Sequence, residues 1–416
     1  MQNKGRENLL VLLLSLIWGF IFLDRMAIAF LTPELANVFH MSNTQIGQIM
    51  LATTLAYALS ALLFSSFIDR TLGSRRGLAT TVLLTSVFAA ASAISRDYHD
   101  LLVFRILTGA CEGPIFPLTM AILSRHSSEG RYALNVGLVQ AGVTVICLTL
   151  GPTAVTHLEA LFTWKVAFAI SALPSLLLGI IAFRFLPEDS RSARVGEHDD
   201  PKSSASNRLG LVGSVLRVRN VWLSVVVCTL TLSGMWLSYT FGPLYWVKSA
   251  RLTAAQMGNL ASIMGLLQIF WVIGIPAISN YVGRRNASTV FLAIASAQML
   301  SLYFVGPSFW TVSFYVVAGG IAGSATSLYM SLLGVESVPK RLAATSSSLI
   351  MGTAEIVGGA AAPMIAGSYA DALGLPVVLL IGGICLAAGA LLSLFFKETK
   401  AARQAAVSTR LSTFAD

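Results

Sequence analysis

Long apolar runs alternate with short polar connections along the whole chain. Most runs reach the length of about 20 residues that an α-helix needs to cross a bilayer. They are continuous rather than alternating, so they indicate helices and not the strands of a transmembrane barrel. They fall at about 9–31, 45–68, 77–95, 101–124, 133–156, 164–186, 220–247, 256–282, 287–306, 309–334, 344–370 and 375–396. The pattern predicts an all-α membrane protein with twelve transmembrane helices.

The longest polar stretch divides these runs into two sets of six. It spans residues 188–219 and is rich in Ser, Asp, Glu, Arg and Pro, a composition typical of a linker. We therefore expect four segments: an N-terminal six-helix half at 1–187, a cytoplasmic linker at 188–219, a C-terminal six-helix half at 220–397 and a cytoplasmic tail at 398–416.

The two halves share an internal repeat at an offset of 210 residues. This offset aligns Gly73 with Gly283, each in the polar loop after the second run of its half. It also aligns Gly109 with Gly319, Arg131 with Arg341 and Gly142 with Gly352. Parallel six-helix repeats are the architecture of transporters that rock around a site between their halves. The repeat thus predicts two pseudo-symmetric halves and alternating access.

Composition excludes a soluble fold. Only 11% of the residues are charged and 55% are hydrophobic, with a mean hydropathy of +0.75, whereas a soluble domain carries about 25% charged residues. The four cysteines all fall inside apolar runs, so we expect no structural disulfides.

The positive charges predict the topology. With the N-terminus in the cytoplasm, the opposite side holds only Arg96, Lys165, Lys248 and Arg251 of the 28 Lys and Arg residues. The positive-inside rule then places both termini in the cytoplasm of a multi-pass protein, which we expect in the cell inner membrane. This asymmetry explains the net charge of +9 without a nucleic acid partner. A secretory signal peptide is disfavoured because Asp24 and Arg25 interrupt the first run.

The loop after the second run carries Asp69, Arg70, Gly73, Arg75 and Arg76. This pattern resembles the cytoplasmic signature of the major facilitator superfamily. It departs from the usual pattern in two ways, because Ser65 stands where a glycine is usual and one residue is inserted before Gly73. The resemblance implies that this loop takes part in the conformational change of transport.

Further motifs lie within the runs themselves: Asp24 and Arg25 in the first run, Arg105, Gly109, Glu112, Gly113 and Pro114 in the fourth, and Thr240, Pro243 and Tyr245 in the seventh. Together they resemble the anion:cation symporter family, which includes sugar-acid and sialin-like transporters. This resemblance implies proton-coupling roles for Asp24 and Glu112. It also implies that Arg25, Arg105 and Tyr57 belong to the substrate and coupling network.

Five ionisable residues lie within the predicted spans: Asp24, Arg25, Arg105, Glu112 and Glu355. A charge at the bilayer centre costs at least about 2.5–3.5 kcal/mol, so such groups usually mark substrate or proton routes. The structural alternative is a neutral network in which two arginines balance two carboxylates. Arg105 and Glu112 are seven residues apart, which puts them on one helix face, and we expect that face to line the cavity.

Further substrate-binding candidates are polar or aromatic residues in other runs: Gln140, Trp236, Tyr239 and Gln268. Aromatic faces and amides can orient an organic anion, although aromatic residues in spans more often pack or face lipid. Glu355 has three open roles besides simple packing. It can accept substrate hydroxyls, bind an amino group or take part in proton coupling, so a zwitterionic substrate remains open.

Together these patterns predict a proton-coupled importer of a small organic carboxylate such as a sugar acid, functional as a monomer. One alternative is a proton-driven exporter of drugs or a siderophore, and another is a membrane sensor. The sequence has no phosphate-binding loop and no histidine spacing typical of a metal site. We therefore expect no enzyme activity, no cofactor besides the coupling proton, and no metal.

Overall fold

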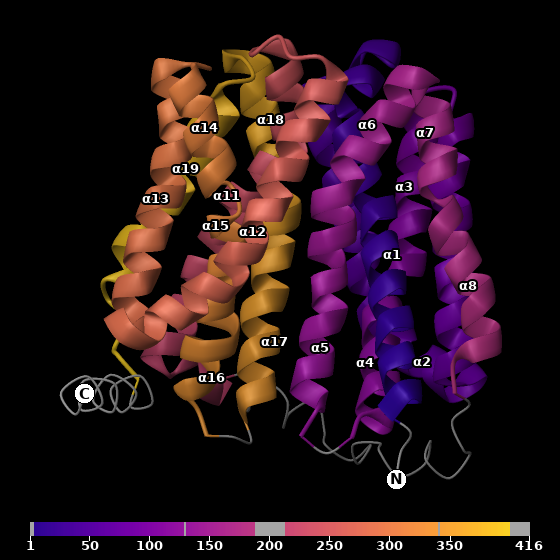
Figure 1. Cartoon of the computed structure of the whole chain (residues 1–416). Coiled ribbons are helices and arrows are strands. Elements are labelled where there is room, and N and C mark those ends of the chain that lie inside the picture. The colour runs from indigo at the N-terminus through magenta and orange to yellow at the C-terminus, as the bar shows by residue number, and fades with distance from the viewer. Residues whose placement is uncertain (1–3, 129, 188–212, 340–341, 400–416) are drawn as a thin grey trace. The chain divides into compact units, whose positions relative to one another are not determined.

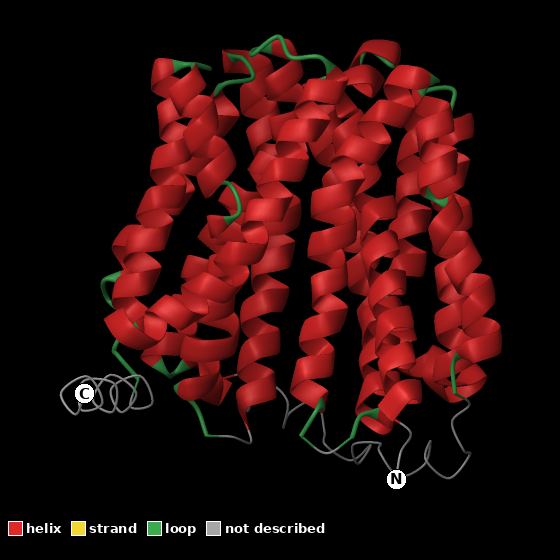
Figure 2. Ribbon diagram, viewed as in Figure 1, coloured by secondary structure: helices red, strands yellow, loops and turns green. Residues whose placement is uncertain are grey.

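The computed structural model describes residues 4–128, 130–187, 213–339 and 342–399. Within these ranges the chain is helical apart from short turns and loops, and it contains no strand (Figure 2). The greater part of the expected linker, and all but two residues of the expected tail, lie outside the described residues. The predicted segment boundaries therefore stay predictions.

The chain divides into two compact units. Unit 1 comprises Met1–His198 and Trp246–Leu266, and unit 2 comprises Asp199–Tyr245 and Leu267–Asp416. The helices in the first part of the chain are α1 (Lys4–Val38), α2 (Asn43–Ala91), α3 (Tyr98–Glu112), α4 (Ile115–His126), α5 (Tyr132–Gly142), α6 (Gly151–Leu161), α7 (Trp164–Ser171) and α8 (Leu173–Phe185). Those that follow are α11 (Arg219–Lys248), α12 (Ala254–Val282), α13 (Arg284–Val305), α14 (Phe309–Ala318), α15 (Ile321–Ser327), α16 (Gly334–Glu336), α17 (Ala343–Ala354), α18 (Ala362–Leu373) and α19 (Val377–Ser393).

The predicted transmembrane helices are confirmed in the described residues. Eleven helical stretches are long and apolar enough to cross a membrane, and Val377–Ser393 adds a shorter apolar helix. The main difference from the sequence prediction is the first span, which extends over Lys4–Val38. Many large apolar side chains are exposed, Leu62 and Trp310 each to 79%, as expected of a surface that faces lipid.

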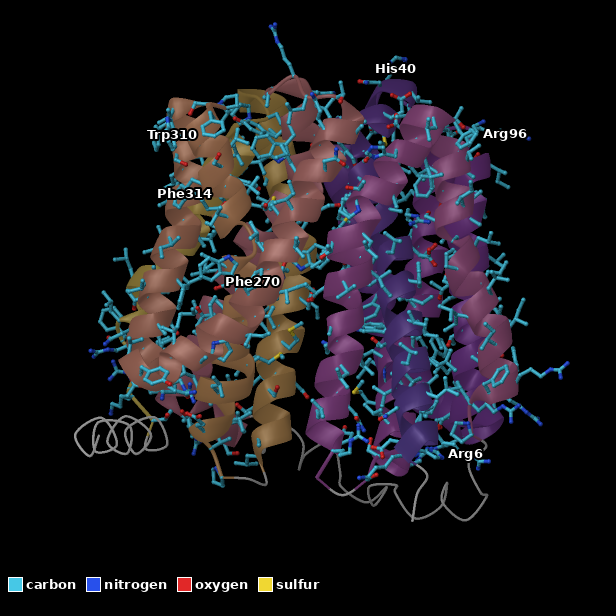
Figure 3. All side chains as sticks on the ribbon, in the orientation of Figure 1. Arg6, His40, Arg96, Phe270, Trp310 and Phe314 are labelled. Atoms are coloured by element: carbon cyan, nitrogen blue, oxygen red, sulfur yellow. The ribbon has the colours of Figure 1, made fainter. Side chains whose placement is uncertain are left out.

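The two ends of the helices in unit 1 carry residues that the sequence predicts on opposite sides of the membrane, and the sidedness itself stays a prediction. In unit 1, Arg6 lies at one end of the helices, whereas His40 and Arg96 lie at the opposite end (Figure 3). The sequence predicts a cytoplasmic position for Arg6 and an outer loop for Arg96. In unit 2, the exposed Trp310 lies near the beginning of α14, where an aromatic ring can anchor a span at the membrane interface.

The aligned glycines of the repeat have the same backbone conformation. Gly73 has φ 79° inside α2, and Gly283 has φ 89° just before α13. Positive φ costs glycine little because it has no Cβ. The chain therefore turns at the same point in both halves, which supports the alignment made from sequence.

The repeat also extends to two π-helical stretches. One covers Val143–Leu150 after α5, and the other covers Glu355–Ala361 after α17. These stretches overlap when shifted by 210 residues, and the sequence pattern did not predict either of them. π-Helical turns are rare in proteins overall, and those that do occur are often found at functional sites. The second stretch begins at Glu355, one of the predicted site residues.

Helix α1 forms the centre of unit 1. It packs against α2, α5, α6 and α8, and Figure 1 shows it running between α5 and α8. Its crossing with α5 depends on small residues, because a Cβ at Gly19 would lie 2.6 Å from the carbonyl oxygen of Gly142. The close approach of these two backbones fixes the position of Asp24 and Arg25 one to two turns further along α1.

The two aligned glycines Gly142 and Gly352 provide a matched test of this packing. A Cβ at Gly142 would lie 2.9 Å from the carbonyl carbon of Ser15 on α1, whereas a Cβ at Gly352 would have no atom within 4 Å. We expect Gly142→Ala to destabilise the protein by about 1–3 kcal/mol through overpacking. Gly352→Ala should be neutral or slightly stabilising because alanine favours helix. Thermal unfolding in detergent measures both, and equal melting temperatures would contradict the packing described for α1.

Candidate functional site

The four predicted charges of the first half lie together in the interior of unit 1. Asp24 and Arg25 come from adjacent positions on α1, and Arg105 and Glu112 come from one face of α3. Their exposed fractions are 1%, 5%, 0% and 0% in that order. The expected shared face of Arg105 and Glu112 is thus enclosed by protein in this structure.

Arg25 contacts Glu112, Thr54 and Tyr57. Its Nη1 lies 3.7 Å from Glu112 Oε1, and its Nη2 donates to Thr54 Oγ1 at 3.1 Å. Its guanidinium also stacks on the ring of Tyr57, with Cζ 4.8 Å from the ring centroid. The predicted residues Arg25, Tyr57 and Glu112 are therefore brought together, with Thr54 as a partner that the sequence did not indicate.

Asp24 is bonded in a different way from Glu112. Its Oδ2 accepts a hydrogen bond from Ser175 Oγ at 2.5 Å, and its Oδ1 has no hydrogen-bond partner among the described residues. Ser175 lies in the first turn of α8, after Pro174. The sequence analysis missed Ser175, because one serine in an apolar run carries little signal.

Arg105 binds main-chain and hydroxyl oxygens. Its Nη1 donates to the carbonyl of Asp24 at 3.0 Å, and its Nη2 to the carbonyl of Ala89 at 3.3 Å. Nε and Nη2 also donate to Ser92 Oγ, at 3.1 and 2.5 Å. In this structure the guanidinium therefore ties α1 to α2. The structural alternative, in which both arginines balance carboxylates, describes Arg25 better than Arg105.

The motif in the loop after the second span makes an ion pair within unit 1. Asp69 accepts a hydrogen bond from Ser74, and its Oδ2 lies 3.3 Å from Arg125 Nη2 on α4. Arg75 donates from Nε to the carbonyl of Phe183 on α8 at 2.9 Å. The motif thus joins α2 to α4 and α8. Two other predicted members, Arg70 and Arg76, are exposed.

Near the corresponding loop of unit 2, the ion pair is formed by an arginine of the loop and an acid outside it. At the offset of 210 residues, Ser279 takes the place of Asp69, and Arg284 takes the place of Ser74. Arg284 Nη1 donates to Ser279 Oγ at 2.5 Å, and Nη2 lies 3.2 Å from Glu336 Oε1. The sequence does not indicate this pair, because its two residues lie 52 positions apart.

The predicted residues of the second half also gather. Tyr239 donates to Gln268 Oε1 at 3.1 Å, and the rings of Trp236 and Tyr239 meet edge to face at 6.2 Å. A Cβ at Gly359 would lie 2.6 Å from Glu355 Oε2 and 2.9 Å from Trp236 Nε1. Trp236, Tyr239, Gln268 and Glu355 therefore form one group in unit 2, with the acid on the side of Trp236.

Gln140 differs from the other predicted site residues. It lies on α5, is exposed, and its Oε1 accepts a hydrogen bond from Trp18 Nε1 on α1 at 2.7 Å. Its amide therefore contributes to the packing of α1 against α5.

Comparison with known proteins identifies the class. Residues 14–363 match the profile of the Major Facilitator Superfamily, and the chain belongs to this superfamily. It is accordingly a multi-pass membrane transporter and not an enzyme. The fold is the twelve-helix architecture with two pseudo-symmetric halves that the sequence predicted.

Several curated relatives transport organic acids. The chain is 22% identical to the hexuronate transporter of Bacillus subtilis, over 79% of this chain and 77% of the relative. It is 26% identical to the 4-hydroxybenzoate transporter PcaK of Pseudomonas aeruginosa, over 82% of each chain. It is 24% identical to a gallate transporter of Pseudomonas putida, over 92% of this chain and 90% of the relative. These names are consistent with the resemblance to the anion:cation symporter family.

Solved structures support the fold. A bacterial homologue of the human lysosomal transporter Spinster, crystallised in an inward-facing and unoccupied conformation, matches with a TM-score of 0.77 and 16% identity over 96% of this chain and 98% of that one. The nucleoside transporter NupG matches with a TM-score of 0.74 and 14% identity over 93% of this chain and 100% of that one. At these identities the likeness concerns the fold alone.

The buried pair Arg25–Glu112 can be tested by a double-mutant cycle. Removing one partner of a buried ion pair in soluble proteins costs about 3–5 kcal/mol, because the other charge stays buried. We expect Arg25→Met and Glu112→Gln each to lower the melting temperature, and the double variant to lose less than the two single losses added. The coupling should be about 0.5–3 kcal/mol.

A second cycle is the control for this test. It pairs Arg25→Met with Glu336→Gln, whose carboxylate binds Arg284 in unit 2, and its effects should be additive. Additive losses for Arg25 and Glu112 as well would contradict a direct interaction between them.

Proposed function

We propose that this protein is a proton-coupled symporter that takes up a small organic carboxylate across the cell inner membrane by alternating access. It works as a monomer with both termini in the cytoplasm. The observation that carries the proposal is the buried cluster of Asp24, Arg25, Tyr57 and Glu112. Burying an ionisable group in the membrane domain costs free energy, and such groups usually mark the path of a substrate or a proton.

The Arg25–Glu112 pair suggests how substrate and proton are coupled. Arginine binds carboxylates in a planar, two-point geometry, so a substrate carboxylate competes with Glu112 for Arg25. Once Arg25 turns to the substrate, Glu112 is a buried carboxylate with less positive charge near it. Burial favours the neutral form of a carboxyl group, so Glu112 takes up a proton when substrate binds.

Asp24 supplies a second proton-binding group in the same unit. If two protons accompany a monoanion, one net positive charge moves with each cycle. The membrane potential then adds about 2.3 kcal/mol of driving force per 100 mV. Uptake should therefore respond to both the pH gradient and the voltage.

The substrate class is proposed from the relatives and from the group in unit 2. Hexuronate, 4-hydroxybenzoate and gallate all combine a carboxylate with hydroxyl groups. Trp236 and Tyr239 offer aromatic faces, Gln268 offers an amide, and Glu355 is an acceptor for hydroxyl groups. We propose a hydroxylated carboxylic acid, with hydroxylated aromatic acids as the first compounds to test.

Glu355 also favours a second candidate. A carboxylate beside aromatic rings can bind an ammonium group, so a substrate that carries an amino group and a carboxylate fits the same residues. Comparing the binding of 4-hydroxybenzoate with that of 4-aminomethylbenzoate separates the two candidates, because only the second compound is a zwitterion at neutral pH.

Neutralising Glu112 tests the coupling. In proteoliposomes with an inward proton gradient, we expect Glu112→Gln to abolish accumulation of 4-hydroxybenzoate above equilibrium, while exchange of internal for external substrate persists. The control is Glu159→Gln, which removes a carboxyl group outside the cluster and should keep accumulation. Full accumulation by Glu112→Gln would remove Glu112 from the coupling role. Wild-type uptake that ignores both pH gradient and voltage would refute proton coupling as a whole.

Changing Glu355 and Trp236 tests the substrate group. A ligand that binds only the folded protein raises the melting temperature by mass action. We expect 4-hydroxybenzoate to stabilise the wild type more than benzoate does, and Glu355→Gln to reduce that difference. Trp236→Ala should weaken binding of both acids about tenfold or more, whereas Trp310→Ala, at an exposed ring, should leave it unchanged. Equal stabilisation of Trp236→Ala and wild type would exclude Trp236 from the site.

A further inference from the structure

A short chain of buried hydroxyl groups ends on Asp24. Ser86 Oγ on α2 lies 2.8 Å from Ser175 Oγ on α8, which lies 2.5 Å from Asp24 Oδ2 on α1. The three residues are exposed by 1%, 0% and 1%. Three helices, α1, α2 and α8, therefore meet in one buried polar contact.

Each hydroxyl group in this chain has two acceptors within reach. Ser175 Oγ lies 2.5 Å from Asp24 Oδ2 and 2.9 Å from the carbonyl of Ala172. Ser86 Oγ lies 2.8 Å from Ser175 Oγ and 2.8 Å from the carbonyl of Val82. A serine hydroxyl has one proton to donate and two lone pairs that accept. Each can therefore make only one of its two donations at a time.

Two complete arrangements follow from this geometry. When Asp24 is ionised, Ser175 donates to the carboxylate and Ser86 donates to Ser175. When Oδ2 carries a proton, Asp24 donates to Ser175 and Ser175 donates to Ala172, while Ser86 donates to Val82 or to the second lone pair of Ser175. The two arrangements differ by the one proton on Asp24 and by rotation of the Ser175 hydroxyl group, and no heavy atom has to move.

We infer that Ser175 and Ser86 form a two-state hydrogen-bond switch that keeps Asp24 bonded in both its ionised and its neutral form and thereby sets the pH at which it exchanges its proton. In this switch Ser175 is a positioning residue for the proton-coupling step, and Ser86 supports it from α2. The inference rests on the proposed function only for the role of Asp24 in coupling.

The local fold explains why Ser175 can serve in this way. Pro174 has no N–H and interrupts the helix between α7 and α8, so that Ala172 lies between the two helices. Ser175 then falls in the first turn of α8, where its hydroxyl reaches back to Ala172 and across to α1. A proline at this position is compatible with the start of a helix.

Other charged or titratable groups also act on Asp24. Arg105 Nη1 binds its main-chain carbonyl at 3.0 Å, and Arg105, Glu112 and the thiol of Cys147 on the π-helical stretch interact with it electrostatically. Arg25 is its neighbour on α1. The test must therefore follow Asp24 itself, and it must compare variants that leave these groups in place.

The test is the titration of Asp24 by infrared spectroscopy, together with the pH profile of uptake. The carboxylic acid C=O band that is lost in Asp24→Asn is assigned to Asp24. In Ser175→Ala the ionised form loses a charge-assisted hydrogen bond and the neutral form loses a weaker one, so the band should persist to a pH about one unit higher. The band should also move to higher frequency, and the uptake profile should shift to alkaline pH by a similar amount.

Three further variants make the result specific. Ser175→Thr retains the hydroxyl group and should restore the wild-type titration. Ser86→Ala removes only the second donor and should shift the titration in the same direction by a smaller amount. Ser171→Ala is the matched control, because among the described residues its buried hydroxyl bonds the carbonyl of Phe168 and not Asp24, and it should leave the titration unchanged.

The outcomes separate this inference from the proposed function. If Ser175→Ala titrates like the wild type while uptake remains coupled to protons, the switch is refuted and the proposed function stands. If the titration shifts as expected but uptake is independent of pH, the switch stands and the coupling role of Asp24 falls. Should Ser175→Ala fail to fold, Ser86→Ala and Ser175→Thr decide by the same titration, and a wild-type result for Ser86→Ala would overturn the two-serine switch.

Discussion

The cost of holding charge inside a membrane determines how unit 1 is built. A charge at the bilayer centre costs at least about 2.5–3.5 kcal/mol, and unit 1 buries two arginines and two carboxylic residues to 5% exposure or less. The protein meets this cost with different partners for each group. Glu112 has a guanidinium, Asp24 has a hydroxyl group, and Arg105 has main-chain carbonyls. These bonds tie α1 to α2, α3 and α8, so the same contacts that allow the charges also fix the helices.

The two halves share a backbone plan and differ in chemistry. The repeat retains the positive-φ glycines Gly73 and Gly283 and the π-helical stretches that follow α5 and α17. Each half also has an ion pair near this loop, Asp69 with Arg125 in the first and Arg284 with Glu336 in the second, although the paired residues do not align at the offset of 210. Among the described residues, the cluster of buried charges lies in the first half, whereas the second half has aromatic rings, an amide and Glu355 in its group. The same backbone repeat therefore carries different side-chain chemistry in each half.

The sequence predicted the helices well because membrane spans have a strong and regular signal. All the predicted spans correspond to helices of the described chain, and the first-half charges that stood out in apolar runs do meet in space. Ser175 and Thr54 could not be identified in this way, because single hydroxyl residues are common in spans and usually bond their own helix. The ion pair of Arg284 and Glu336 joins residues 52 apart in sequence, a partnership that only the fold reveals. The hydrogen bonds from Arg105 to main-chain carbonyls could not be predicted either, because every residue has a carbonyl group and the sequence does not distinguish among them.

The different partners of the two carboxyl groups matter for the proposed mechanism. Glu112 is held by Arg25, so it responds to anything that competes for that arginine, above all a substrate carboxylate. Asp24 is held by Ser175 of α8, and the carbonyl of its own residue is held by Arg105 of α3, so it responds to movement of α1 against those helices. One group therefore reports occupancy and the other reports conformation. A symporter needs both sensitivities, because a proton that follows occupancy alone would be released without transport, and a proton that follows conformation alone would cross without substrate. In the proposed mechanism, placing the two groups on α1 and α3, with Arg25 beside Asp24, links the two responses within one cluster.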